Sequence, residues 1–232
     1  MKIVLEKAHV IECGYSISCK PHYPKDLYQL FGDNKQQVIK SPFKKRSLFS
    51  NAILQALSTG NKRVILKALT DDNRLDIVDE SNKEAAFVHE YFVYMYNFYK
   101  SPSLVDNEAM FNHKLILPLL EMACSHSCLK FVPREVLLSS TDEPYNADAV
   151  VKFEDIEVCL LETSGHYGLS DKGRFGYGHA KGAFSAISMI RHAYKKYPYA
   201  TITVAQALRV FFMHAKEKKL NLWSLEFVFL GV

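Results

Sequence analysis

Several common sequence signals are missing from this chain of 232 residues. No apolar run is long enough for a transmembrane helix, and the charged N-terminus has no signal-peptide core, so membrane insertion and secretion are not expected. The cysteines number five and none has CxxC spacing, which indicates free thiols in a reducing compartment and argues against structural zinc. No GxGxxG or Walker pattern is present. These absences predict an intracellular protein, in the nucleus or the cytoplasm, with no membrane partner.

Strong charge of one sign is also missing. The net charge of +4 permits an anionic partner but does not require one. The hydrophobic fraction of 48% and the aromatic fraction of 12% are those of a globular protein with a sizeable core. We expect either one large domain or a core with an accessory half.

The most informative stretch lies between residues 146 and 181. Ala147–Phe153 and Glu157–Thr163 are apolar runs separated by a charged turn, a pattern typical of a β-hairpin. Each run carries an acid at the open end of the hairpin, Asp148 in the first and Glu162 in the second. The expected register pairs Asp148 with Glu162, Val150 with Leu160 and Lys152 with Val158. It requires an odd-numbered loop or a bulge near residues 154–156, and it directs both acids to one face of the sheet.

Two neighbouring carboxylates repel each other unless a cation lies between them or one takes up a proton. Mg²⁺ suits such a pair because it prefers hard oxygen ligands. In the alternative interpretation, Asp148 only starts a strand and Glu162 ends one in solvent. The apolar run Val158–Leu161 favours a buried strand, where an acid without a partner is costly.

The rest of the sequence predicts further helices and strands. Before residue 101 we expect short strands, a loop with a basic patch at 40–46, two helices over 47–69 separated at Gly60, and an aromatic helix over 81–100 that packs on the core. After it we expect a helix from residue 106 or 107 to 125 kinked by Pro118, a strand at 130–139, a helix at 179–196, and strands at 206–215 and 220–230. Half of all glycines fall within 165–178, which favours a mobile loop over the site.

Two charged residues on these helices have alternative interpretations. Glu108 lies on the apolar face of its helix and either faces the acidic pair or simply suits the helix dipole. Lys181 is expected in the first helical turn, where a cation is disfavoured, and either points at the acids or is solvated. His166 and His179 are either phosphate contacts or loop residues.

Taken together, Glu108 on a helix, a strand around 132–139, Asp148 on the next strand and Glu162-Thr163-Ser164 on a third resemble the PD-(D/E)xK nuclease superfamily. The resemblance covers about residues 104–232. It implies an α/β (α+β) fold with a restriction-endonuclease-like αβββαβ core and a central mixed sheet over residues 101–232. A mainly helical N-terminal extension over residues 1–100 would be the accessory part.

The resemblance also implies a function, namely hydrolysis of phosphodiester bonds in nucleic acid, in DNA rather than RNA, with Mg²⁺ or Mn²⁺. Asp148, Glu162 and the backbone carbonyl of Thr163 would hold the metal, and Glu108 would assist. The Lys that the family places two residues after the Glu is Ser164 here, so Lys181, or else Lys172, would supply the ammonium. Ser164, Lys172 and His179 would contact nucleic acid. Without an ammonium at the site, the chain would be an inactive nuclease-fold protein that binds nucleic acid or another protein.

Overall fold

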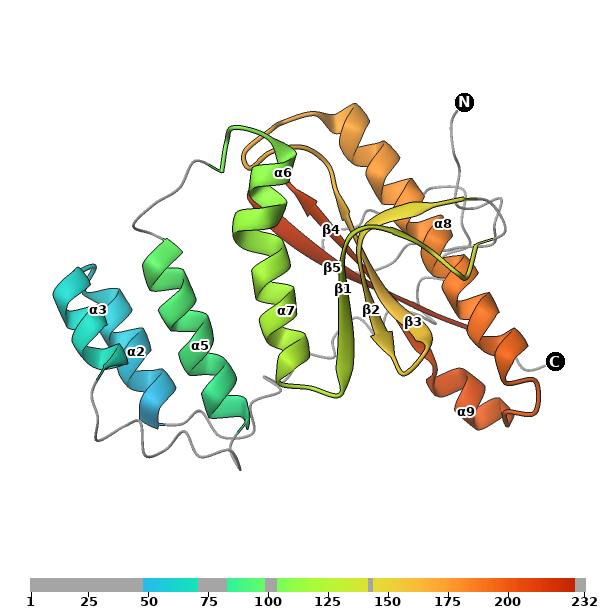
Figure 1. Ribbon diagram of the computed structural model, residues 1–232, viewed down its shortest axis with the longest axis horizontal. Helices are drawn as coiled ribbons and strands as arrows, with labels where there is room; N and C mark the ends of the chain where they lie inside the picture. The colour runs from blue at the N-terminus through green and yellow to red at the C-terminus, as the bar shows by residue number, and fades with distance from the viewer. Residues whose placement is uncertain (1–47, 71–82, 99–103, 142–143, 228–232) are drawn as a thin grey trace, which may run out of the picture.

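The computed structural model describes residues 48–70, 83–98, 104–141 and 144–227, and it contains one five-stranded mixed sheet (Figure 1). The strands lie in the order in which they occur in the chain: β1 (Leu129–Leu137), β2 (Asn146–Phe153), β3 (Ile156–Thr163), β4 (Arg209–Lys216) and β5 (Lys219–Glu226). Neighbouring strands are antiparallel except for β3 and β4, which are parallel. The expected mixed α/β architecture is therefore confirmed.

The hairpin of β2 and β3 has the expected register at its open end but not at its turn. Val150 pairs with Leu160 as predicted, whereas Lys152 pairs with Glu157 and not with Val158. The turn consists of two residues, Glu154 and Asp155, with Glu154 in the left-handed region at φ 53°. Two-residue turns suit the twist of a hairpin, so the extra residue is accommodated by a bulge in the strand opposite Lys152.

Helices cover both faces of this sheet (Figure 1). The long helix α8 (Lys172–Lys196) packs its Ala183, Ala186, Met189 and Ile190 against one face. The other face is covered by α6 (Glu108–Phe111), the π-helix η3 (Asn112–Ile116) and α7 (Leu117–Ser125). The strand residues alternate between the two cores, so Val150 and Leu160 meet α8 while Ala149 and Leu161 meet the other layer.

Helix α8 begins earlier than the sequence indicated. It was expected from His179, but Asp171 caps it and it starts at Lys172, so Gly173, Gly176 and Gly178 are helical and the expected mobile loop over 165–178 is wrong for them. Packing explains one of these glycines, because a Cβ on Gly178 would lie 2.3 Å from the Ser164 hydroxyl oxygen. Lys181 therefore lies in the third turn, and the expected dipole cost of a first-turn cation does not apply.

The kink expected at Pro118 stays a prediction, but the helix before β1 is irregular. Asn107 and not Asp106 caps it, since its side chain accepts a hydrogen bond from the Met110 N–H. The irregularity takes the form of the π-helical turn at residues 112–116, just before Pro118. π-Helical turns are rare and often lie at functional sites.

Three helices of the N-terminal part are described: α2 (Leu48–Ser58), α3 (Lys62–Leu69) and α5 (Lys83–Phe98). The predicted break at Gly60 is confirmed, and α5 contacts α7 as expected for a helix that packs on the core. A short helix, α9 (Ile202–Ala207), occupies the start of the expected strand at 206–215. The expected N-terminal strands and the basic patch at 40–46 lie outside the described residues. None of the helices described here is both long and apolar enough to span a membrane.

Candidate functional site

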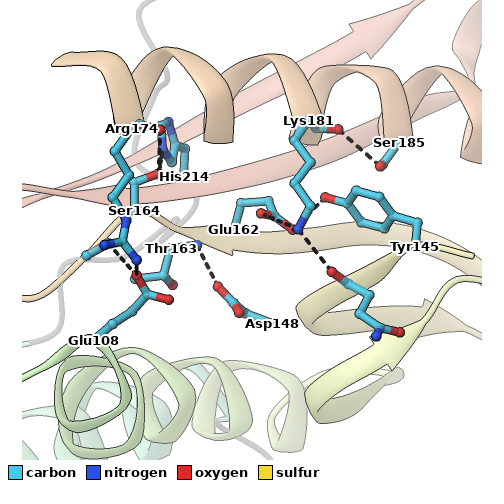
Figure 2. A network of polar contacts seen from close by, with 12 residues as sticks. Glu108, Tyr145, Asp148, Glu162, Thr163, Ser164, Arg174, Lys181, Ser185 and His214 are labelled. Atoms are coloured by element: carbon cyan, nitrogen blue, oxygen red, sulfur yellow. Dashed lines mark hydrogen bonds and ion pairs between the residues drawn. The ribbon is translucent and has the colours of Figure 1, made fainter. Parts of the chain in front are cut away.

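The open end of the β2–β3 hairpin brings the two predicted acids together. The pairing of β2 with β3 ends at Ala149 and Leu161, and Asp148 and Glu162 are the residues next to this last pair. The Thr163 N–H donates to Asp148 Oδ2 at 2.6 Å, so a carboxylate continues the strand pairing where the backbone ladder ends (Figure 2). Asp148 and Glu162 therefore lie on neighbouring strands at the open end of the hairpin. The expected direct pairing of the two, with both side chains on one face of the sheet, is not confirmed, because Glu162 contacts Lys181 of α8 whereas Asp148 contacts Thr163 and the Asn112 side chain of η3.

Glu162 is the more deeply buried acid of the pair, with a residue exposure of 4%. Its Oε1 accepts a hydrogen bond from the Tyr145 hydroxyl at 2.5 Å. The Lys181 ammonium lies 3.1 Å from each carboxylate oxygen. Burial raises the pKa of Glu162 to about 7, and the Asp148 charge adds to this rise, while Tyr145 and Lys181 oppose it.

Asp148 is half-buried, and burial raises the pKa of its carboxyl as well. The Thr163 hydroxyl and N–H, the Lys181 charge and the Asn112 side chain oppose that rise. When both acids are ionised, the charge of the Lys181 ammonium balances only one of the two carboxylates and leaves one negative charge. The site is thus electrostatically suited to a further cation or a proton.

Lys181 reaches the site from the third turn of α8 (Figure 2). In addition to its contacts with Glu162, its ammonium donates to the Asn146 carbonyl at 3.2 Å and lies 4.5 Å from the centre of the Tyr145 ring. Lys181 was expected either to point at the acids or to be solvated, and the structure shows its ammonium in contact with Glu162. Lys172, the second candidate for the ammonium, is exposed in the first turn of the same helix.

Glu108 has a different environment from that of the acidic pair. Its Oε2 accepts hydrogen bonds from the Gly165 N–H at 2.5 Å and from the Arg174 guanidinium at 2.7 Å. It also occupies the first turn of α6, where the helix dipole favours an acid. Glu108 thus ties the segment that follows β3 to the start of α8, and its assistance to a metal stays a prediction.

Ser164 and His179, both predicted to contact nucleic acid, lie against the sheet. Ser164 is 2% exposed and its Oγ lies 2.8 Å from His214 Nε2. His179 belongs to α8, not to a loop, and its ring packs on Trp223 with 4.7 Å between the ring centres. Burial lowers the pKa of His214 to about 4, with smaller contributions from Lys216 and His179, so its imidazole is neutral at pH 7.

Sequence reasoning missed three residues of this site. Tyr145 was part of an expected turn, although an aromatic residue three positions before Asp148 was a usable signal. Asn112 comes from the π-helical turn, and its Oδ1 accepts from the Thr163 hydroxyl at 2.6 Å. Arg174 lies in the glycine-rich segment that was expected to be a loop. All three depend on contacts between elements, which residue spacing alone does not reveal.

The oxygen groups at the hairpin end are of the chemical kind that a hard divalent cation prefers. Asp148 and Glu162 supply carboxylate oxygens, and the Thr163 carbonyl belongs to the same strand end. Within the described ranges, no three His, Cys, Asp or Glu side chains are grouped as an ion site. A metal would therefore be held by the two acids, a backbone oxygen and water, which agrees with the tendency of Mg²⁺ to keep several waters.

Comparisons with known proteins add no relative to this picture: no family model, no curated protein and no solved structure matches the chain.

Proposed function

We propose that this protein is a metal-dependent nuclease of the PD-(D/E)xK type, acting on nucleic acid and on DNA in preference to RNA. The observation that carries the proposal is the meeting of Lys181 with Glu162, at 3.1 Å, beside Asp148 on the neighbouring strand. The Lys181 ammonium, which comes from α8, would replace the lysine that the family carries at the position of Ser164. Two acids and a lysine at one strand edge form a set of groups suited to phosphodiester hydrolysis.

The order of the elements supports the same proposal. A helix (α6 to α7), three antiparallel strands, the crossover helix α8 and the parallel strand β4 follow one another as in an αβββαβ core. Asp148 lies near the start of β2 and Glu162 near the end of β3, where Glu162 meets Lys181 of α8 and Asp148 meets Thr163 and Asn112. This arrangement suits a restriction-endonuclease-like fold.

Each residue of the site then has a role that follows from its position. Asp148 and Glu162, together with the Thr163 carbonyl, would hold Mg²⁺ or Mn²⁺. Bound there, the ion would lower the pKa of a coordinated water and neutralise charge on the phosphate. Lys181 would orient the attacking water through its ammonium or stabilise the charge that develops on the phosphate oxygens. Binding of a cation requires Lys181 to share Glu162 with it.

A second candidate is a nuclease-fold protein that binds nucleic acid or another protein without cutting. The ion pair between Lys181 and Glu162 favours it, because the ammonium already balances one carboxylate without any metal. This candidate predicts no cleavage and no metal binding at the acidic pair.

Cleavage assays with four variants test the proposal. Supercoiled plasmid and a single-stranded oligonucleotide would be incubated with Mg²⁺, Mn²⁺ or EDTA. We expect D148N, E162Q and K181M each to lower the cleavage rate by about 10²-fold or more, since each removes a group that acts on the transition state. K195M is the matched control, because Lys195 is exposed in the last turn of α8, and it should cleave at the wild-type rate.

Mn²⁺ titration followed by electron paramagnetic resonance separates the two candidates. A nuclease should bind Mn²⁺, D148N and E162Q should lose that binding, and K181M should retain it. Wild-type protein that binds an oligonucleotide but neither takes up Mn²⁺ nor cleaves would support the non-catalytic candidate. An unchanged cleavage rate after replacing both acids with alanine would contradict the nuclease.

A further inference from the structure

Tyr145 contacts both charged partners of the site with two different parts of its side chain. Its hydroxyl donates to Glu162 Oε1 at 2.5 Å, and its ring face lies 4.5 Å from the Lys181 ammonium (Figure 2). These two contacts are made by one rigid group. Tyr145 thus fixes the position of an acid from β3 relative to a lysine from α8.

The surroundings of Tyr145 hold that side chain in place. Its backbone carbonyl accepts from the Leu138 N–H at 2.9 Å, which ties it to the end of β1. Its ring packs against the core between the sheet and α8. The next residue, Asn146, offers its carbonyl to the Lys181 ammonium at 3.2 Å. The Tyr145 ring and the Asn146 carbonyl, from two consecutive residues, therefore both contact the Lys181 ammonium.

We infer that Tyr145 is a positioning residue of this site, which holds Lys181 with its ring face and orients the Glu162 carboxylate with its hydroxyl. The inference rests on the proposed function, because it gives Tyr145 a role in that same site. A long lysine side chain has many rotamers, and an aromatic face within 6 Å attracts an ammonium. The hydroxyl fixes one carboxylate oxygen, as residues hydrogen-bonded to metal ligands do.

Two substitutions separate the two contacts. Tyr145→Phe keeps the ring and removes only the hydroxyl, whereas Tyr145→Leu removes both. Lys181 should therefore stay in place in Y145F and leave it in Y145L. Y199F is the matched control, since Tyr199 is 97% exposed.

The first measurement needs neither metal nor substrate. The Lys181 ε-methylene signal, assigned by its loss in K181M, should be shifted upfield by the Tyr145 ring current in the wild type. We expect the upfield shift to persist in Y145F and Y199F and to disappear in Y145L, with all proteins folded by circular dichroism. A wild-type signal at the position of a solvated lysine, or one that Y145L leaves unmoved, would overturn the inference. Because no cleavage is involved, this result is independent of the nuclease proposal.

The second measurement tests the role in function. Y145F should weaken Mn²⁺ binding about tenfold, the lower end of the range for lost partners of metal ligands. K181M should lower kcat about 10²-fold in the wild type and in Y145F, but by less than about twofold in Y145L, where the ammonium has already left its place. An equal effect of K181M in all three backgrounds would overturn the role of the ring. Wild-type protein without Mn²⁺ binding or cleavage would instead refute the nuclease proposal, while the nuclear magnetic resonance result would still stand.

Discussion

At the scale of single residues, the ionisation of Glu162 links the site to stability. Its pKa in the folded protein is about 7, against 4.5 for an ordinary Glu, and its side chain is 6% exposed. Between these two pH values the folded protein keeps the proton longer than the unfolded chain does. Without metal, the free energy of unfolding should therefore fall as pH rises from about 4.5 to 7, by about 3 kcal/mol from this residue.

Denaturant unfolding of the wild type and E162Q in EDTA, at several pH values from 4.5 to 8, measures this contribution. Other groups titrate in both proteins, so the difference between the two curves isolates Glu162. We expect the stability of E162Q relative to the wild type to increase through this window. Saturating Mg²⁺ should raise the wild-type curve above pH 7, because binding to the folded state alone stabilises it. A constant difference between the two proteins at every pH would refute the shifted pKa.

At the scale of elements, the periodicity of apolar residues predicted the pairing of the hairpin strands but not the start of α8. The alternation of apolar residues was sufficient to pair Val150 with Leu160. The start of α8 was missed because glycine has a low helix propensity, so the glycines in this segment predicted a loop. Packing requires one of these glycines, since a Cβ on Gly178 would lie 2.3 Å from the Ser164 hydroxyl oxygen. Such close approaches depend on tertiary contacts that a single sequence does not display.

Two glycines of α8 give opposite expectations for the same substitution. A Cβ on Gly178 would meet the buried Ser164 hydroxyl at 2.3 Å and His214 Nε2 at 3.2 Å, whereas Gly176 has no atom within 4 Å of that position. G178A should destabilise the protein by about 1–3 kcal/mol through overpacking. G176A should stabilise it by about 0.5–1 kcal/mol, because alanine loses less backbone entropy in a helix.

Denaturant midpoints of the two variants, with unchanged slopes, check this pair. G176A is the control for helix propensity, since both positions lie in one helix. Equal stability of the two variants would mean that α8 does not approach β3 and β4 as closely as the structure shows. It would also contradict the placement of α8 from which Lys181 contacts Glu162.

At the scale of the whole molecule, the N-terminal helices are joined to the core through α5. The heavy aromatic content of that helix predicted burial on several sides, whereas its described side chains are half-buried or exposed. Its expected packing on the core is confirmed, since Phe87 packs edge-on against His126 at the end of α7, with 5.8 Å between ring centres. The sequence did not reveal which core helix would receive α5, because aromatic residues around a helix specify burial but no partner. The division of the chain at residue 100 stays a prediction.

One contact between these parts compensates for Pro118. In a regular α-helix the N–H of residue 118 would donate to the Lys114 carbonyl, but proline has none. The Tyr94 hydroxyl on α5 donates to that carbonyl instead, at 2.5 Å. Y94F should lower the free energy of unfolding by about 1 kcal/mol, the usual net value of such a bond.

The P118A background provides the decisive comparison. Alanine restores an N–H that can satisfy the Lys114 carbonyl from within the helix, so Y94F should cost less there than in the wild type. Y91F is the matched control, because Tyr91 contacts Phe87 and Phe92 through its ring and loss of its hydroxyl should change little. Denaturant unfolding of the four proteins of this cycle gives the coupling energy between Tyr94 and Pro118. If Y94F costs the same with and without Pro118, Tyr94 does not replace the missing bond and α5 is joined to the core by ring packing alone.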